Sequence, residues 1–546
     1  MVVVSYDGIA MKIPGLAAGV VVLLSFLRPL AGHAEWTQDA HDAQRSGATS
    51  EEPLAPWTLA WTWNGPDAQG GRDGHFYNAP REARTVTGGD FVYVPAGKEG
   101  LFALRKSDGT QTWKITATAF DAAPAYDPQC GVLYAGGADG WLYKIATRDG
   151  AIVAKCELGQ PLRKAVLLAG DAAYVVSDDG ALHRIALGTM ERVWSYEPHA
   201  AVATPAAFSS ARGLVVYATN DLRVHAVNAA EGRARWSVKP TLLPAGFPNE
   251  MDGGWPVIAE EHGIVFVRMR LDHESGLWSG PAEKKRYPDS CAETRAFLEA
   301  NPHLKNLFAL RLEDGGEAFI PAVGYGGVEA LENGRPFLDI GTLPVVRRRP
   351  DGSEVAYMLF RNGQRRPPDG RWDSNLGEMV LDDTTIPGLA GGDLRFVEFP
   401  NSMVRITDEQ CPLTIAGETI FHAHWGASEA TRIANREAAL GLAFASPIKT
   451  QVHPPVVRRV RPTRDFDPAT HWTKSGLTLF DDGRYWEGPG WWVYWNCLDP
   501  PTPHRRAYSE GLRPRYTYVS DGLVVVEGNG GEVFVLRHSG KPAARR

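Results

Sequence analysis

The chain has 546 residues, 44% of them hydrophobic, and a formal net charge of -7, so it is long enough to bury a large core. Its charges are spread along the sequence without a long run of one sign. A nucleic-acid partner is therefore not expected, because phosphate binding needs a concentrated basic surface. The densest basic segments, 347–349 and 458–461, are short and border prolines, and we interpret them as solvated edges.

The N-terminal segment has the pattern of an export signal. An apolar run, residues 13–27, follows Lys12 and precedes a small-x-small sequence that ends at Ala34. This pattern is typical of a cleaved signal peptide over residues 1–34, and the run is short for a membrane span. We therefore expect an exported protein, periplasmic or extracellular, that begins near Glu35 and has no membrane span after cleavage. An uncleaved anchor is the alternative.

A frame of about forty residues recurs from Leu101 onward. The segment LFALRKSDGTQTW begins at 101, and related segments begin at 142, 182, 224 and 307, so the steps are 41, 40, 42 and 83. Each copy has two strand-like segments around a turn, and an apolar run precedes it. A period near forty made of strands predicts a β-propeller with one four-stranded antiparallel blade per repeat.

We predict a single all-β propeller over residues 35–546, with eight blades as the first choice and seven as the alternative. The count stays open because the frame loosens beyond Phe319. Long insertions are expected at about 270–303, 364–375 and 427–474, and Glu429–Phe444 has helical spacing. The polar residues 36–46 are expected to form an arm on the surface.

The two ends of the chain complement each other. Residues 56–63 alternate like a strand and end in tryptophan, as the last strand of several repeats does. Residues 515–540 contain a hairpin with Asn529-Gly530 at its turn and stop where a tryptophan-bearing strand should begin. We expect a closure blade in which the N-terminal strand pairs with this hairpin and removes the open edges of the ring.

Tryptophans recur at the end of the repeat, at Trp61, Trp113, Trp194 and Trp236. We expect these four side chains to be structural and to pack between neighbouring blades, where each covers a large apolar area. Ala154 and Phe319 take the same position in the other copies, so the position tolerates changes of size.

The densest aromatic stretch of the chain is a candidate ligand site. It contains Trp486, Trp491, Trp492 and Trp495. Exposed indole rings would form a stacking platform for a sugar or another flat ligand. Packing between blades is the alternative, because this fold already uses tryptophan in that way.

A pair of histidines is a candidate metal site. His422 and His424 alternate on a predicted strand, so their side chains share one face. Two imidazoles would hold a metal together with a carboxylate such as Asp465 or Asp467. Ordinary polar contacts are the alternative interpretation.

The five cysteines, at positions 130, 156, 291, 411 and 497, form no CxxC motif, no CxxCH motif and no adjacent pair. A covalently attached c-type haem and a zinc site of the usual spacing are therefore not expected. A disulfide among Cys291, Cys411 and Cys497 is left open. The sequence also has no Gly-x-Ser-x-Gly turn of the kind that carries a nucleophilic serine.

The segment Ala103–Trp113 resembles the A-x-D-x-x-T-G-x-x-x-W repeat of PQQ-like (quinoprotein-type) β-propellers, and Ala226–Trp236 fits it with Asn228 at the aspartate position. The resemblance is clear over residues 85–319 and 519–540. The family includes quinoprotein alcohol and sugar dehydrogenases, for which the resemblance implies PQQ and calcium at the ring axis. It also includes propellers without quinone that act as protein-binding scaffolds, such as the outer-membrane protein assembly lipoprotein.

The chain departs from both kinds of relative. It lacks the adjacent cysteine pair of many quinoprotein alcohol dehydrogenases, and no motif places their calcium ligands or catalytic aspartate. It also lacks the lipobox cysteine of the assembly lipoprotein. We therefore expect an exported binding module or scaffold, not an enzyme, with an unknown protein or small molecule bound on one rim. A PQQ-dependent oxidoreductase with calcium is the alternative, and a metal-assisted enzyme built on His422 and His424 is a further one.

Overall fold

The computed structural model describes most of the first three hundred residues after the N-terminal segment and parts of the remainder. Described are residues 5–6, 9–10, 35–52, 57–63, 65, 80–246, 249–272, 291–323, 327–332, 335–337, 343–349, 351–366, 371–384, 388–398, 413–417, 419–424, 427–432, 514–528, 531, 533–538 and short strands between 466 and 494. The chain divides into two units, residues 1–33 and 34–546. In the first unit, β1 (Ser5–Tyr6) pairs antiparallel with β2 (Ile9–Ala10). The signal peptide stays a prediction. None of the helices in the described part is both long and apolar enough to cross a membrane.

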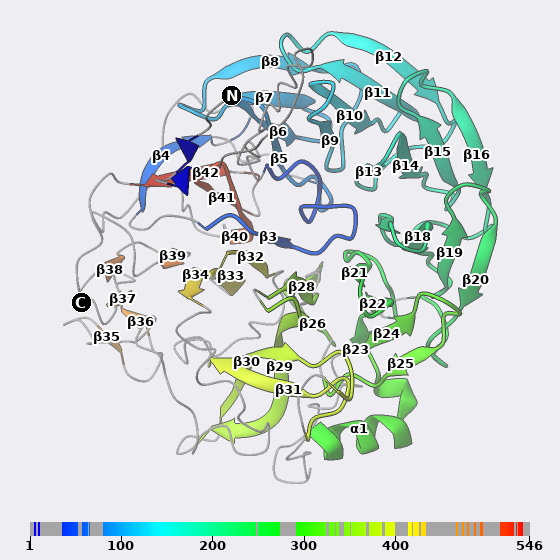
Figure 1. Ribbon diagram of the computed structural model, residues 1–546, viewed down its shortest axis with the longest axis vertical. Coiled ribbons are helices and arrows are strands. Elements are labelled where there is room, and N and C mark those ends of the chain that lie inside the picture. The colour runs from blue at the N-terminus through cyan, green and yellow to red at the C-terminus, as the bar shows by residue number, and fades with distance from the viewer. Residues whose placement is uncertain are drawn as a thin grey trace. The chain divides into compact units, whose positions relative to one another are not determined.

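The second unit contains seven four-stranded antiparallel blades arranged as a propeller ring (Figure 1). Five blades come from the regular repeats, and their strands pair in order from the inside of the ring outward. They are β5 (Val86–Gly88), β6 (Phe91–Pro95), β7 (Leu101–Arg105) and β8 (Gln111–Ile115); β9 (Ala125–Asp127), β10 (Val132–Gly136), β11 (Trp141–Ala146) and β12 (Ile152–Glu157); β13 (Leu167–Ala169), β14 (Ala172–Val176), β15 (Leu182–Ala186) and β16 (Arg192–Tyr196); β17 (Ala207–Ser209), β18 (Leu214–Ala218), β19 (Val224–Asn228) and β20 (Ala234–Val238); β21 (Val257–Ala259), β22 (Ile264–Arg268), β24 (Leu307–Arg311) and β25 (Glu317–Phe319).

Two further four-stranded blades come from the later part of the chain. One contains β28 (Val345–Arg348), β29 (Glu354–Arg366), β30 (Arg371–Met379) and β31 (Leu394–Glu398), and the other contains β4 (Trp57–Trp63), β40 (Pro514–Ser520), β41 (Leu523–Gly528) and β42 (Val533–His538). Between them lies a five-stranded mixed sheet of β3 (Ala48–Thr49), β32 (Thr414–Ala416), β33 (Thr419–His424), β34 (Ala427–Arg432) and β39 (Trp492–Tyr494). The seven four-stranded blades match the alternative count, and a count of eight needs the mixed sheet to be included.

Two features of the repeats fit these blades: inner strands that are buried on both faces, and a β-bulge at the same position of each repeat. Strands such as β14 and β18 are buried at every residue, because a neighbouring sheet covers each of their faces. The outermost strands β8, β12, β16 and β20 carry most of the exposed residues. In all five regular blades the register shifts by one residue between the third and fourth strands, at the same position of the frame.

The N-terminal strand β4 pairs antiparallel with β42, with Trp57 opposite His538 and Trp63 opposite Val533. Strand β4 therefore takes the outer position in the sheet that contains the C-terminal hairpin β41–β42. That this pairing closes the ring stays a prediction, which is tested below.

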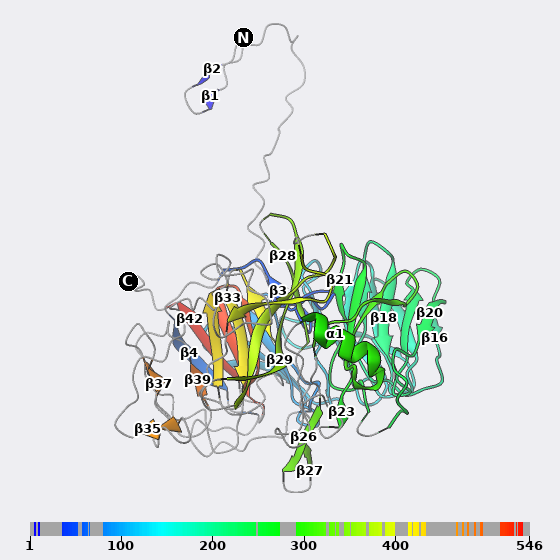
Figure 2. The ribbon, with the colours of Figure 1, turned by 90° about the horizontal axis from the view of Figure 1, so that it is seen from below.

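The remaining described elements lie at one rim and on the outside of the ring. Helix α1 (Cys291–Ala300) and the 3₁₀ turn Pro302–Leu304 precede β24. A small sheet of β23 (Leu271–Asp272), β26 (Gly327–Glu332) and β27 (Arg335–Phe337) lies at the rim opposite to β3 and β28 (Figure 2). The short strands β35 (Phe466–Asp467), β36 (Trp472–Thr473), β37 (Thr478–Leu479) and β38 (Tyr485–Trp486) form two hairpins. The helix expected over Glu429–Phe444 is wrong at its start, because residues up to Arg432 pair as strand β34 with β33.

The recurrent tryptophans lie between blades. Trp113 Nε1 donates a hydrogen bond of 2.7 Å to the Thr147 carbonyl of the next blade, and its ring covers Gly150, where a Cβ would come within 2.9 Å of the indole. Gly150 has a φ of +74°, so the turn needs glycine both for its backbone and for the close approach. The other three tryptophans repeat this contact: Trp61 with Lys106 and Gly109, Trp194 with Ala229 and Gly232, and Trp236 with Leu312 and Gly315.

The two copies without tryptophan keep the contact in altered form. Where Ala154 replaces the tryptophan, the next blade has Met190 instead of glycine, at a φ of +58°. Met190 is buried and packs in the same cluster as Ala154, so the longer side chain fills the space of the missing indole. Phe319 packs against Gly391 and Gly392 of the following blade. The contact between neighbouring blades is therefore kept in these copies, although the residues that form it differ.

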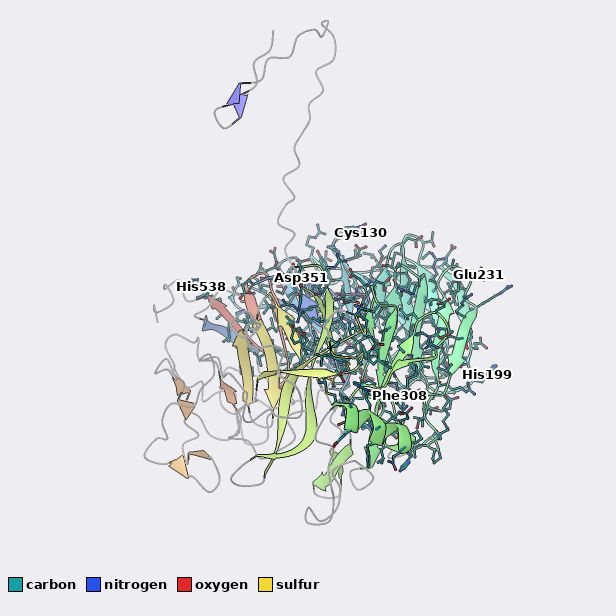
Figure 3. The ribbon with its side chains drawn as sticks, turned by 60° about the horizontal axis from the view of Figure 1, so that its bottom comes forward. Cys130, His199, Glu231, Phe308, Asp351 and His538 are labelled. Carbon is teal, nitrogen blue, oxygen red and sulfur yellow. The ribbon has the colours of Figure 1, made fainter. Side chains whose placement is uncertain are left out.

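Three cysteines lie in the described part of the chain. Cys130 is exposed (Figure 3), whereas Cys156 and Cys291 are buried, and all three are free. Cys411 and Cys497 lie outside the described residues.

Candidate functional site

Residues 35–52, which we call the N-terminal belt, run inside the ring from one blade to the next (Figure 1). Backbone carbonyls of the belt accept hydrogen bonds from the middle residue of successive innermost strands. The pairs are Trp36 with Thr87, Thr37 with Tyr126, Ala43 with Phe208, Gln44 with Ile258, Ser46 with Val346 and Gly47 with Ile415. The Gln38 side-chain oxygen accepts a hydrogen bond of 3.0 Å from the Leu168 amide. The Glu51 carboxylate accepts one of 2.9 Å from the Asp521 amide. The belt thus lies along the inner edges of β5, β9, β13, β17, β21, β28 and β32, and contacts the turn after β40.

No residue of 36–46 is exposed, so the expectation of a surface arm is wrong. Trp36, Asp39, Ala40 and Arg45 have no exposed surface. Its path bends tightly because Ala40 and Arg45 take left-handed conformations, with φ of 56° and 55°. Non-glycine residues adopt this conformation at a cost of roughly 1–2 kcal/mol each, so the hydrogen bonds to the blades must hold it in place.

A chain of alternating charges extends from the belt along the ring axis. Arg45 lies 3.6 Å from Asp39, Asp39 lies 2.9 Å from Arg84, and Arg84 lies 3.4 Å from Glu82. Lys164 lies 3.2 Å from Glu82 and 2.6 Å from Asp252. Asp252 also lies 3.5 Å from Arg81. We call these seven residues the axial charge chain. The residues come from the belt and from the segments just before β5, β13 and β21, so folding of the ring brings them together.

The axial charge chain passes from buried to exposed. The side chains of Arg45 and Asp39 are fully buried and Arg84 is 2% exposed, whereas Asp252 is 44% exposed. Water therefore reaches the chain at its Asp252 end and not at the belt. The Arg45 guanidinium also donates to the carbonyls of Ala206, at 2.6 Å, and Asp39, at 2.9 Å.

Opposite charges set the protonation of these groups. Burial alone would lower the pKa of Lys164, but Glu82 and Asp252 outweigh it and raise this pKa. Burial alone would raise the pKa of Glu82, but Lys164 and Arg84 outweigh it, and the pKa of this carboxyl is lowered. Arg84 also has a raised pKa despite its burial, because Asp39 and Glu82 favour the charged form. These shifts favour the charged forms of Glu82, Arg84 and Lys164.

Aromatic rings pack around the buried end of the charge chain. The Trp36 ring stacks on Tyr518 with centroids 5.0 Å apart, and the Arg84 guanidinium lies 4.6 Å from the centroid of Trp255. Tyr516 lies edge-on to Trp255 at 6.3 Å, and burial raises its pKa well above the ordinary value. These rings exclude water from the axis next to the belt.

The described axial residues do not fit the PQQ and calcium of quinoprotein dehydrogenases. Calcium takes six to eight oxygen ligands, but Asp39, Glu82 and Asp252 are each held by arginine or lysine. With four cations and three carboxylates, the charge chain would repel a divalent ion. A flat ring stacked on Trp255 would have to displace Arg84 from its face. No cluster of metal-ligating side chains is present among the described residues.

The side chains of the sequence-predicted ligand sites lie outside the described part. His422 and His424 are two residues apart on β33, and His422 pairs in register with Glu429 of β34. Trp486 ends β38, and Trp492 begins β39, which pairs in parallel with β34. Asp467 ends β35, and Trp491, Trp495 and Asp465 lie outside the described residues. The metal site and the stacking platform stay predictions.

Two histidine networks resemble catalytic groups but repeat as structural contacts. His183 Nε2 lies 3.1 Å from Ser177 Oγ, and His225 Nε2 lies 2.9 Å from Thr219 Oγ1, at the same position of consecutive blades. Burial lowers the pKa of both histidines to about 4. Ser177 and Thr219 have no exposed surface, so a substrate cannot reach either hydroxyl. We therefore assign both networks to the packing of the blades.

The sequence pattern predicts neither the belt nor the axial charge chain. The residues of both occur once each and follow no motif. The available signal was the position of Arg84 and Lys164 directly before innermost strands, where a charged side chain must point toward the axis or into a blade interface.

The blade architecture and its repeat are those of a β-propeller. Residues 117–242 match the family model described as outer membrane protein assembly factor BamB, which confirms the resemblance seen in the repeat. Among curated protein sequences, none matches the chain.

Several solved structures are similar to the chain at low identity. BamB from Moraxella catarrhalis is 12% identical, with 90% of this chain and 100% of that chain covered and a TM-score of 0.44. A europium-containing methanol dehydrogenase is 12% identical, with 75% and 84% covered and a TM-score of 0.45. The quinohemoprotein alcohol dehydrogenase ADHIIG from Pseudomonas putida HK5 is 11% identical, with 94% and 82% covered and a TM-score of 0.48. Such distant likenesses decide no function.

Proposed function

We propose that this PQQ-like β-propeller is an exported binding module whose ring axis is structural and whose ligand contacts lie on a rim. The observation that carries the proposal is the N-terminal belt. It covers the inner edges of the sheets and seals one end of the axial charge chain with the buried residues Trp36, Asp39 and Arg45. Export is supported by the signal-like pattern of residues 1–34.

The axial charges support a structural use of the axis. Each carboxylate of the axial charge chain is already held by a cation, so a cofactor would gain its contacts only by breaking those pairs. Removing one partner from a buried pair costs about 3–5 kcal/mol, which a cofactor would have to offset. Fold alone does not assign quinone chemistry, because function depends on the site built on the fold.

Reconstitution with PQQ and calcium tests the proposal. The purified protein is incubated with both, and thermal unfolding and dye-linked oxidation of alcohols and sugars are measured, with a quinoprotein dehydrogenase as the positive control. We expect no turnover and an unchanged Tm. Bound PQQ at 100 times its Kd would add about 2.7 kcal/mol of stability. Saturable turnover together with a raised Tm would show a quinoprotein oxidoreductase instead.

A further inference from the structure

The third and fourth regular blades carry a histidine where the other regular blades carry a phenylalanine or a tyrosine. The five side chains take the same place relative to the shared β-bulge: Phe102, Tyr143, His183, His225 and Phe308. All five are buried. Imidazole is the only one of these rings that titrates near neutral pH. Two neighbouring blades therefore bury a group that can change its charge.

The second blade shows how this position is built around a tyrosine. The Tyr143 hydroxyl donates a hydrogen bond to Asp139, in the turn before its strand. Gly137 leaves room for the ring, because a Cβ there would come within 2.9 Å of the Tyr143 side chain. In the next two blades a hydroxyl residue replaces the glycine and the aspartate is kept: Ser177 with Asp179, and Thr219 with Asp221.

The hydrogen bonds around His225 determine which ring nitrogen carries the hydrogen. Thr219 Oγ1 lies 2.5 Å from Asp221 Oδ1 and 3.4 Å from the Arg223 carbonyl. Both are acceptors, so the single hydroxyl hydrogen points away from the imidazole. His225 Nε2 therefore donates to Thr219, at 2.9 Å, and Nδ1 accepts from the Tyr196 hydroxyl of the third blade, at 3.1 Å. This set of bonds requires neutral His225.

His183 is held in the same way within the third blade. Ser177 Oγ lies 2.5 Å from Asp179 and 3.2 Å from the Ala181 carbonyl, so its hydrogen is also directed away from the ring. His183 Nε2 donates to Ser177 at 3.1 Å, and Nδ1 accepts from Ser195 Oγ at 2.7 Å. Both nitrogens are again satisfied by the neutral form alone.

The groups around the two rings do not compensate a positive charge. Burial lowers the pKa of each histidine to about 4, and the attraction of the turn aspartate is opposed by a neighbouring arginine. The charged and titratable groups that face the rings are Asp179 and Arg192 for His183, and Asp221, Arg223, Tyr196 and Tyr217 for His225.

We propose that the third and fourth blades form an acid-sensitive sector of the ring, which loosens when His183 and His225 are protonated. Protonation adds a hydrogen at Nδ1, where a hydroxyl now donates, and puts a charge in a buried site. At His225 the affected hydrogen bond joins the two blades directly, through Tyr196. The proposal concerns the fold and does not depend on the proposed binding role.

The loosening follows the difference between the folded and unfolded pKa values of the two histidines. The folded pKa is about 4 and the ordinary value is 6.5, so the full stability of the sector is present above pH 6.5. It is lost as the pH falls toward 4. At pH 5, each histidine should raise the opening equilibrium constant of the sector roughly thirtyfold relative to pH 8.

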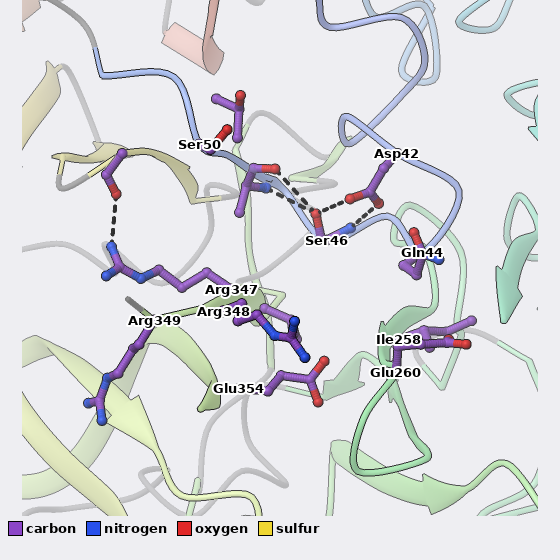
Figure 4. A pocket seen from close by; sticks show the side chains of 14 residues that line it. Asp42, Gln44, Ser46, Ser50, Ile258, Glu260, Arg347, Arg348, Arg349 and Glu354 are labelled. Carbon is purple, nitrogen blue, oxygen red and sulfur yellow. Dashed lines mark hydrogen bonds between the residues drawn. The ribbon is translucent and has the colours of Figure 1, made fainter. Parts of the chain in front are cut away.

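The acid-sensitive sector also holds the middle of the belt. The Phe208 amide donates to the Ala43 carbonyl at 2.7 Å, and Arg45 donates to the Ala206 carbonyl at 2.6 Å. These belt residues alternate with others that line a pocket of about 550 Å³ between the belt, β21 and β28 (Figure 4): Asp42, Gln44 and Ser46. Loosening of the fourth blade therefore reaches one wall of this pocket.

Hydrogen exchange of the full protein, followed by mass spectrometry at pH 8 and pH 5 and corrected for intrinsic rates, tests the proposal. We expect peptides from 172–196 and 214–228 to lose protection at pH 5 at least about tenfold more than peptides from 91–115, in the first blade. Equal losses in all three regions would overturn the proposal.

A variant that copies the second blade isolates the two histidines. It combines four substitutions, His183→Tyr with Ser177→Gly and His225→Tyr with Thr219→Gly. The extra loss of protection at pH 5 should disappear, and its persistence would contradict the proposal. The control is His199→Asn, at an exposed histidine between the same blades (Figure 3), which should respond as the parent does. Asparagine suits the left-handed backbone there, at a φ of 62°.

A second measurement needs no variant. Hydrogen exchange at the imidazole C2 position, followed by mass spectrometry, gives the pKa of each histidine in the parent protein. His183 and His225 should titrate well below 6.5, and an ordinary pKa for both would overturn the proposal. Circular dichroism and Tm at pH 8 verify that the variants are folded.

Discussion

Neighbouring blades contact each other in two different ways. Near the outside of the ring, a tryptophan of one blade covers a glycine of the next, as Trp113 covers Gly150, and this contact recurs around the regular blades. Near the axis, the contacts are made by the N-terminal belt and the axial charge chain, whose members occur once each. The outer contacts are mostly apolar and interchangeable, whereas the inner ones are hydrogen bonds of the belt and ion pairs that depend on single residues.

This difference decides how each layer responds to change. Loss of an apolar contact costs the transfer free energy of the side chain and leaves a cavity. Loss of one charge in a buried chain leaves its partners unpaired, which costs more. The comparison therefore predicts a graded series of effects from the axis outward.

The largest effect is expected for Asp39→Ala. This carboxylate lies between Arg45 and Arg84, and its loss leaves two buried guanidinium groups without an anion. We expect the free energy of unfolding to fall by about 3–5 kcal/mol, measured by urea denaturation. Arg148→Ala, which breaks the exposed pair with Asp149, is the control and should change stability by less than about 0.5 kcal/mol. Similar small effects for both variants would contradict the ionic character of the inner layer.

A smaller loss is expected for the outer layer. Trp113→Ala removes a side chain that is 7% exposed and should cost about 3 kcal/mol in urea unfolding, at the lower end of the range for buried tryptophans. Trp194 is only partly buried, and its alanine variant should cost less. Equal losses for both would show that burial does not govern this contact.

Ring closure can be tested with the same substitution at Trp61, which lies on β4 and covers Gly109 of the first regular blade. If β4 closes the ring, Trp61→Ala should cost as much as Trp113→Ala, because both indoles join neighbouring blades. Unfolding midpoints of the two variants make the comparison. A negligible loss at Trp61 would show that the ring does not depend on the pairing of β4.

Ala154 and Met190 take the places of the tryptophan and the glycine, and substitutions at both positions test whether the two side chains share one space. Ala154→Trp alone should destabilise by about 1–3 kcal/mol, because the indole overlaps the buried methionine. Adding Met190→Gly restores the pair found elsewhere in the ring and relieves a left-handed methionine. We expect a favourable coupling of about 0.5–3 kcal/mol from the double-mutant cycle. Additive losses would mean that the two positions do not share one space.

The smallest effect concerns pH at the contact between the fifth and sixth blades. His262 lies 2.8 Å from Glu354 and 3.0 Å from Asp382, and the hydrogen bond to Glu354 raises its pKa despite burial. The protonated form therefore stabilises the fold fully below the unfolded pKa, about 6.5. This stability is lost as the pH rises through the raised pKa. The stability difference between the parent and His262→Gln should shrink between pH 6 and 9, and a difference that grows would contradict it.

The sequence predicts the outer layer well and the inner layer poorly. Repeated residues such as Trp113 and Trp236 mark the frame, because each blade must solve the same packing problem. The belt could not be predicted from its polar composition, since residues such as Asp39 and Arg45 are buried only after all the blades have surrounded them. The pocket could not be predicted either, because residues of the belt, β21 and β28 that line it are distant in sequence.

The central claim is that the belt covers the inner edges of the blades, and hydrogen exchange measures this directly. The amides of Tyr126, Phe208, Ile258 and Val346 donate hydrogen bonds to carbonyls of the belt. We predict that they exchange as slowly as the buried amides shared by β6 and β7. Exchange as fast as that of exposed amides without a hydrogen bond would contradict the account.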